Sequence, residues 1–356
     1  MGPLSSFSVV SLFLLSVSLF FGVCLPARTA PAEKQTQTIT IGVEEINARW
    51  GDQFQRLIDA ELGKEVTGFA ELKKYLNRFG YIRPIPGTNF TDVFDDRLVS
   101  AVRKYQSNFG LPVTGRLDSH TISSINTPRC GVSDTPSAGP LHTTRRYQFF
   151  QGQPRWTRST LTYSFSPTNS IDYLDPSDVQ NAFRRAFSRW AAVIPVTFME
   201  TPYYLSADIK IGFYRGDHGD GEPFDGVLGV LAHAFSPENG RFHLDAAETW
   251  ALDLGTEKSK SAIDLESVAT HEIGHVLGLA HTPVKEAIMY ASLSPRIKKV
   301  DLTVDDVNGA QFLYGSNPNF NRSSLAASDT SNASVYTVAV GRILLGLLML
   351  ILVRAT

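Results

Sequence analysis

The sequence predicts an α+β fold, in which helices pack on a sheet and a small helical module precedes that domain. Three segments have the character of strands, at residues 161–165, 208–213 and 230–235, and the first alternates apolar and polar side chains. Two longer segments, which begin near residues 175 and 261, have the caps or the spacing of helices. The chain of 356 residues is 43% apolar and only 19% charged, so it can form at least two folded units.

An apolar run at residues 9–24 opens the chain, and small residues follow it. The run is short for a membrane anchor, so we interpret residues 1–30 as a signal peptide that is removed on export. Asn-x-Ser/Thr acceptors for glycosylation, at Asn89, Asn321 and Asn332, agree with an exported chain.

Residues 67–125 predict a small helical unit. Two segments place apolar residues on one helical face, and a third short helix begins near Asp118. Gly80 and Gly110 follow the first two segments as C-terminal stops. The stretch at residues 103–115 resembles the three-helix peptidoglycan-binding-like module, which implies a prodomain ahead of a hydrolytic domain.

The next segment, residues 133–144, is rich in Ser, Thr, Pro and Gly, which predicts an exposed linker that is open to proteolysis. Beyond it, Asp175 and Pro176 open a helix as N-cap and first helical residue. Thr303, with Asp306 three residues later, predicts a capping box on the last helix, which ends at Gly315.

The tail consists of a Ser-rich linker at residues 316–334 and an apolar segment at residues 335–356. Arg342 interrupts the apolar segment and leaves a stretch that is short for a membrane span. Small residues, a spacer and an apolar end fit a signal for a GPI anchor, which we favour over a transmembrane anchor.

The segment from His271 to His281 has the pattern H-E-x-x-H-x-x-G-x-x-H, which is typical of metzincins. His271 and His275 are four apart on a helix, and Gly278 can turn the chain so that His281 reaches the same ion. Three nitrogens leave the fourth position of a catalytic zinc open for water. We expect Glu272 to act as the general base in peptide hydrolysis.

A second group of His residues precedes that helix. Three His and one Asp can close a tetrahedral shell with no open position, as in a structural zinc site; they are His218, Asp220, His233 and His243. Residues with oxygen ligands alternate with this group along the chain, and such ligands suit calcium. The candidate calcium residues are Asp225, Gly226, Asp245 and Glu248. The alternative for the His group is that these residues are scattered over the surface, and the alternative for the acidic residues is an ordinary solvated loop.

Once the signal peptide is removed, Cys130 is the only thiol left, so it is either an intermolecular partner or a reactive group. The segment at residues 128–134, together with the His motif and the turn around Met289, resembles the matrix metalloproteinases, in particular short plant-type members without a hemopexin domain. The resemblance implies a metzincin domain with a twisted mixed sheet at residues 147–315, preceded by a propeptide at residues 31–146. It also implies that the Cys130 thiolate occupies the open zinc position, so that the precursor is latent.

The resemblance also gives zinc and calcium as cofactors, and extracellular proteins or peptides as substrates. It places the activating cleavage before Tyr147, whose new ammonium group would pair with Asp305 or Asp306. We expect substrate to lie antiparallel to residues 230–234, beside a pocket lined by Leu231 and the loop at residues 291–294.

The partners that follow are an activating protease and, through the C-terminal anchor, the outer face of the plasma membrane. A formal charge of −2, from 33 Lys and Arg against 35 Asp and Glu, predicts no nucleic-acid partner. The alternatives are a non-catalytic cell-wall glycan-binding protein and another metzincin family.

Overall fold

The structure is a computed structural model that describes residues 54–135 and 147–322. All of these residues belong to the second of two compact units, Ile41–Thr356. The predicted signal peptide, most of the linker, Asn332 and the apolar tail lie outside the described residues. Within residues 54–135 and 147–322, no helix is both long and apolar enough to span a membrane.

The N-terminal module has three helices, as predicted: α2 (Phe69–Arg78), α3 (Asp96–Asn108) and α4 (Ser119–Ile125). Their apolar faces are buried against one another, with Leu72, Leu98 and Ile122 fully inaccessible to solvent. Asp118 caps α4 by accepting a hydrogen bond from Thr121 N. Gly80 follows α2 with a positive φ of 87°, which confirms its role as a helix stop.

A six-stranded mixed sheet forms the second part, with the strand order β1-β5-β6-β4-β2-β3. Neighbouring strands are parallel except for β5 and β6, which are antiparallel. In chain order the strands are β1 (Arg129–Cys130), β2 (Thr160–Phe165), β3 (Thr197–Glu200), β4 (Ile209–Tyr214), β5 (Val230–Ala234) and β6 (Arg241–Asp245). This confirms the predicted twisted mixed sheet and adds β1 and β3, which the sequence pattern did not indicate.

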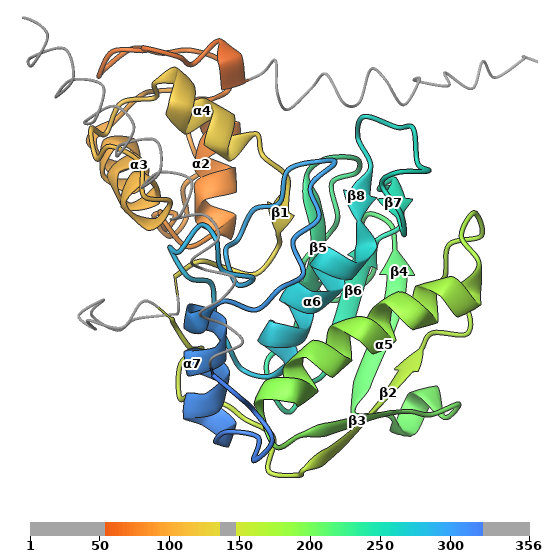
Figure 1. Ribbon diagram of the computed structural model, residues 1–356. Coiled ribbons are helices and arrows are strands. Elements are labelled where there is room, and N and C mark those ends of the chain that lie inside the picture. The colour runs from red at the N-terminus through yellow and green to blue at the C-terminus, as the bar shows by residue number, and fades with distance from the viewer. Residues whose placement is uncertain (1–53, 136–146, 323–356) are drawn as a thin grey trace, which may run out of the picture. The chain divides into compact units, whose positions relative to one another are not determined.

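Two helices, α5 (Pro176–Val193) and α6 (Leu265–Val276), pack side by side on the sheet (Figure 1). Asp175 caps α5 and Pro176 is its first residue, as predicted. The fully buried Trp190 joins the helices, because its indole N–H donates to Thr270 O at 2.9 Å. The helix α6 is buried on every side, so its position is fixed by packing and not by one apolar stripe.

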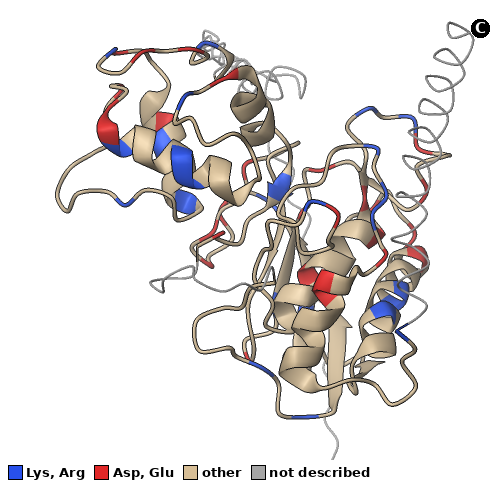
Figure 2. Ribbon diagram, turned by 60° about the vertical axis from the view of Figure 1, so that its left-hand side comes forward, with Lys and Arg blue, Asp and Glu red and all other residues tan. Residues whose placement is uncertain are grey.

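The remaining elements close the domain. The predicted capping box of Thr303 and Asp306 is present at the start of α7 (Val304–Tyr314). The shorter elements are η1 (Tyr204–Ser206), β7 (Trp250–Ala251) and β8 (Ile263–Asp264), of which the last two pair with each other. Figure 2 shows acidic and basic residues interspersed along the ribbon of the described residues.

Candidate metal centre and active site

The three His residues of the predicted catalytic zinc site meet at the end of α6. His271 and His275 lie one turn apart on this helix, and Gly278, with φ of 102°, ends it. A Cβ atom at Gly278 would lie 2.1 Å from Pro154 O, so only glycine fits at this turn. The chain then returns to place His281 Nε2 at 3.1 Å from His275 Nε2 and 3.3 Å from His271 Nε2.

Hydrogen bonds behind the rings decide which nitrogen faces the centre. Each Nδ1 has an acceptor beside it: Ile288 O at 2.6 Å from His271, Leu279 O at 2.8 Å from His275, and Asp134 Oδ1 at 2.8 Å from His281. A neutral imidazole has one N–H, so donation from Nδ1 leaves a bare lone pair on Nε2. Burial lowers the pKa of all three rings and keeps them neutral. Lone pairs this close repel unless a cation lies among them, and the donor set suits zinc.

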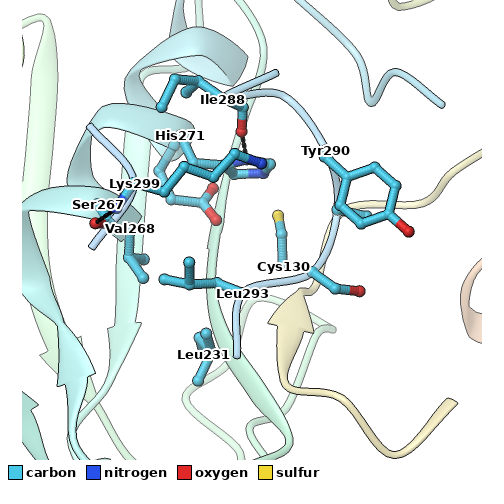
Figure 3. A pocket seen from close by; sticks show the side chains of 12 residues that line it. Cys130, Leu231, Ser267, Val268, His271, Ile288, Tyr290, Leu293 and Lys299 are labelled. Carbon is cyan, nitrogen blue, oxygen red and sulfur yellow. Dashed lines mark hydrogen bonds between the residues drawn. The ribbon is translucent and has the colours of Figure 1, made fainter. Parts of the chain in front are cut away.

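Cys130 completes this group from the N-terminal part of the chain. Its Sγ lies 3.4 Å from His275 Nε2, and the four donor atoms lie within 4.8 Å of one another. Figure 3 shows the sulfur pointing into the pocket that His271 also lines. Backbone hydrogen bonds hold Cys130 in place, from Cys130 N to Ala291 O at 2.9 Å and from Gly131 N to Ala232 O at 2.8 Å. Thiolate and three imidazoles form a closed tetrahedral set for zinc.

Glu272 is fully buried beside this group. Neither of its carboxylate oxygens has a hydrogen-bond partner among the described residues. Burial raises its pKa to about 8. Burial and the neighbouring Glu272 charge also raise the pKa of the Cys130 thiol well above its usual range, so a cation is needed to favour the thiolate.

Asp134 is a site residue whose role sequence reasoning missed. Its carboxylate accepts from Arg129 Nη2 and Tyr81 Oη at 2.6 Å each, and from His281 Nδ1 at 2.8 Å. Burial opposes its ionisation, but the charge of Arg129 and the hydrogen bond from His281 outweigh burial and hold the pKa of Asp134 below its usual range. One carboxylate therefore connects the N-terminal module, the Cys130 segment and a zinc ligand.

Met289 packs on α6 at Gly274, between His271 and His275 in the chain. A Cβ atom at Gly274 would lie 2.2 Å from Met289 Sδ, so a glycine in α6 admits the thioether. The Asp306 carboxylate fixes the turn by accepting from Ile288 N at 2.9 Å and Met289 N at 3.0 Å. Met289 thus contacts the ligand helix by packing.

A pocket next to His271 has an apolar wall that includes Leu231, Val268 and Leu293 (Figure 3). Of the predicted lining, Leu231 and residues 291–293 are present, whereas Ser294 does not line the pocket. No sequence pattern indicated Lys299 at this position; its side chain lines the pocket, and its Nζ donates to Lys285 O at 2.8 Å. Burial lowers the pKa of Lys299 to about 8.

The second His group also converges. His233 and His243 are cross-strand partners in β5 and β6, and the loop after β4 brings His218 and Asp220 to them. Asp220 Oδ2 lies 2.7 to 2.9 Å from one nitrogen of each His. Burial lowers the pKa of His233 and of His243 to about 4, although Asp220 opposes this shift. Four neutral or anionic donors without an open position fit a structural zinc ion.

The predicted calcium residues lie in the loop before β5 and at or just after the end of β6, and they form a looser group. Gly226 N donates to Asp245 Oδ2 at 3.2 Å, and Leu228 N donates to Glu248 Oε1 at 2.7 Å. Glu248 Oε2 is buried and lacks a partner among the described residues. Burial and then the charge of Asp245 raise the pKa of Glu248 to about 9, and burial is also the main reason that the pKa of Asp245 is raised to about 6. Together with Asp225, these oxygens suit a hard divalent cation such as calcium.

Comparison with known proteins agrees with this geometry. A family model described as matrixin matches residues 155–315, and one for a peptidoglycan binding domain matches residues 67–125. The chain is 55% identical over 318 residues to metalloendoproteinase 1-MMP of Arabidopsis thaliana, and the match covers 86% of each chain. It is 58% identical over 289 residues to metalloendoproteinase 4-MMP of the same plant, covering 78% of this chain and 83% of the relative. Metalloendoproteinase 1 of Glycine max is 46% identical over 267 residues, covering 72% and 85%.

Proposed function

The chain belongs to the matrixin family of zinc metalloendopeptidases, and from that premise we propose that it is exported as a latent precursor whose own Cys130 blocks the active site. The observation that supports latency most directly is the Cys130 sulfur among His271, His275 and His281. We further propose residues 31–146 as the propeptide and residues 147–315 as the catalytic domain.

The three His residues would hold the catalytic zinc through Nε2. A zinc ion at this position supplies a Lewis acid, which polarises a carbonyl and acidifies water. Glu272 lies beside the site without a competing hydrogen bond, so its carboxylate is free to take a proton from the attacking water and deliver it to the leaving amine. Burial raises the pKa of this carboxyl towards the range in which a carboxyl can both take up and give back a proton.

The direction of the propeptide strand β1 also supports the proposed latency. The strand β1 pairs in parallel with β5, whereas we expect a substrate to lie antiparallel to β5. The propeptide therefore occupies the edge that a substrate would use, but with the opposite polarity. Its own peptide bonds are not presented in the orientation proposed for cleavage.

We assign a structural zinc to His218, Asp220, His233 and His243, and calcium to Asp225, Gly226, Asp245 and Glu248. The substrates proposed are extracellular proteins or peptides, and a separate protease would start activation. Asn89 and Asn321 are exposed, which suits glycosylation. We keep the GPI signal at residues 335–356 as a proposal; release of the protein from cell surfaces by a phosphatidylinositol-specific phospholipase would test it.

The decisive experiment is digestion of a peptide library by the activated enzyme, with and without a zinc chelator. Cleavage should stop with chelator, and Glu272→Ala should keep its zinc yet lose about 10²- to 10⁴-fold in turnover. Glu286→Ala, which removes an exposed carboxylate, is the matched control and should retain activity. Near-normal turnover by zinc-loaded Glu272→Ala would refute the assigned base. Binding of wall glycan by a chain that cleaves no peptide would favour the non-catalytic alternative.

A further inference from the structure

A cavity of about 260 Å³ lies between α2 and the segment at residues 225–230; none of the proposed zinc ligands lines it, but Asp225 of the proposed calcium group does. The N-terminal part contributes Tyr75, Arg78, Phe79 and Arg129 to its lining, and the catalytic part contributes Leu228 and Val230. Its volume approaches the roughly 300 Å³ at which ligand pockets begin. The cavity therefore has room for a compact organic molecule.

Several polar atoms on the residues that line this cavity have no hydrogen-bond partner. Arg129 is 2% exposed; its Nη2 is used by Asp134 and its Nε by Cys130 O, but its Nη1 has no partner. The same holds for Arg78 Nε and Nη2, the Tyr75 hydroxyl and Asn126 Oδ1, although Arg78 Nε lies 3.8 Å from the half-exposed Glu222 carboxylate, an ion pair beyond hydrogen-bond distance. All of these unpartnered atoms except Asn126 Oδ1 can donate a hydrogen bond. Buried donors without partners are costly, so this arrangement favours a bound group rich in acceptors.

The other lining groups restrict the class of ligand. The Arg129 guanidinium lies over the Phe79 ring at 3.5 Å, and aliphatic side chains of Leu228 and Val230 complete an apolar surface. The lining has three cationic side chains, Lys74, Arg78 and Arg129, against two carboxylates, Glu71 and Asp225, so one cation is in excess. The two guanidinium groups recognise a carboxylate better than a neutral acceptor, because hydrogen bonds between ions are the stronger ones. The apolar surface suits the body of the same molecule.

We propose that this cavity is a binding site for a small carboxylate with an apolar body, which locks the precursor in its latent form. Both parts of the chain supply walls, so the complete site exists only while the propeptide is docked. A ligand that binds the docked state alone shifts the equilibrium towards it by the factor 1 + [L]/Kd. The site adds a small-molecule control to the proposed latency, and binding itself does not depend on peptidase activity.

The test uses the full zinc-loaded precursor carrying Glu272→Ala, which prevents self-processing, and phenylacetate as the probe. Calorimetry should show saturable binding of phenylacetate and weaker binding of the neutral phenylacetamide. Arg78→Met and Tyr75→Phe should each weaken binding, the first by at least about tenfold, since a charge-assisted hydrogen bond is lost. Tyr75→Phe removes only an unpartnered hydroxyl, so it should fold normally. Arg116→Met, at an exposed position outside the cavity, is the matched control.

A second measurement follows the alkylation of Cys130 by iodoacetamide, which requires the propeptide to open. Where closing is faster than labelling, phenylacetate should slow the reaction by the factor 1 + [L]/Kd. Absence of saturable binding at millimolar concentrations, or binding that Arg78→Met leaves unchanged, would overturn the site. Binding that leaves the labelling rate unchanged would overturn its role in latency. If labelling is fast without any ligand, the proposal that Cys130 is docked in the active site is wrong, and this failure is distinct from failure of the ligand site.

Discussion

Asp134→Asn tests the contact between the propeptide and the zinc ligand His281. The Asp134 carboxylate accepts from His281 Nδ1 at 2.8 Å through Oδ1, the oxygen that also accepts from Arg129 Nη2, whereas Oδ2 accepts from Tyr81 Oη. An asparagine whose oxygen keeps the place of Oδ1 can still accept from His281 and Arg129, but it carries no charge, and its N–H₂ group faces the Tyr81 hydroxyl. A hydrogen bond to a charged group contributes about 1.5–3 kcal/mol and a neutral one about 0.5–1.5 kcal/mol, so the contact across the interface should weaken by about 1–1.5 kcal/mol. The docked state should lose roughly fivefold to tenfold in population relative to the open state.

The assay is the rate of Cys130 alkylation in the zinc-loaded precursor, which should rise by the same factor where closing outpaces labelling. The control is Tyr81→Phe, which removes a 2.6 Å hydrogen bond to Asp134 from within the propeptide and leaves His281 untouched. It should lower the melting temperature of the precursor, and it should raise the labelling rate by less than Asp134→Asn does. A change of less than about twofold in Asp134→Asn, with a folded propeptide and zinc bound, would refute the reasoning, because loss of the charge from this hydrogen bond should cost more than that.

Three further predictions follow from the site. Cys130→Ser should give a precursor that cleaves peptide without prior processing, because a neutral hydroxyl binds zinc less well than thiolate; a silent, intact mutant would contradict the switch. Active enzyme should begin at Tyr147, and the new ammonium group should pair with Asp305. Asp306 already accepts hydrogen bonds from Ile288 N, Met289 N and Thr303. N-terminal sequencing that finds another start would refute this boundary. In the calcium-free protein the folded-state pKa of Glu248, about 9, exceeds its ordinary 4.5, so the contribution of this group to stability is fully present below about pH 4.5 and is lost as the pH rises towards 9. Dialysis into calcium-free, zinc-containing buffer should therefore lower the melting temperature more at about pH 8 than at about pH 5, and an equal loss would argue against the calcium assignment.

Sequence reasoning predicted the elements whose signals are local. The cap at Asp175, the capping box at Thr303 and the turn at Gly278 depend on a few adjacent residues, and all three are present. The His ligands were predictable for the same reason, since spacing on one helix and one turn places them. The strand β1 was not, because its two residues have no pattern of their own and become a strand only by pairing with β5.

The unpredicted parts of the site come from contacts between distant segments. Asp134 and His281 are 147 positions apart, and nothing near either residue indicates that they meet. Lys299 enters the pocket wall because the chain after the Met289 turn folds back along α6, where Lys299 N donates to Ser267 Oγ at 2.7 Å. Such contacts depend on tertiary packing, and a single sequence has no periodicity or spacing that reports it.

The position of β1 at the end of the sheet has a consequence for solubility. While β1 is in place, β5 is an interior strand; once β1 leaves, β5 becomes the edge, and its five residues are Val, Leu, Ala, His and Ala. An apolar edge strand with unpaired backbone groups can pair with another copy of the same chain as readily as with a substrate. While β1 is paired, it covers this aggregation-prone edge. We therefore expect the enzyme without its propeptide to self-associate more readily than the full chain when no substrate covers the edge.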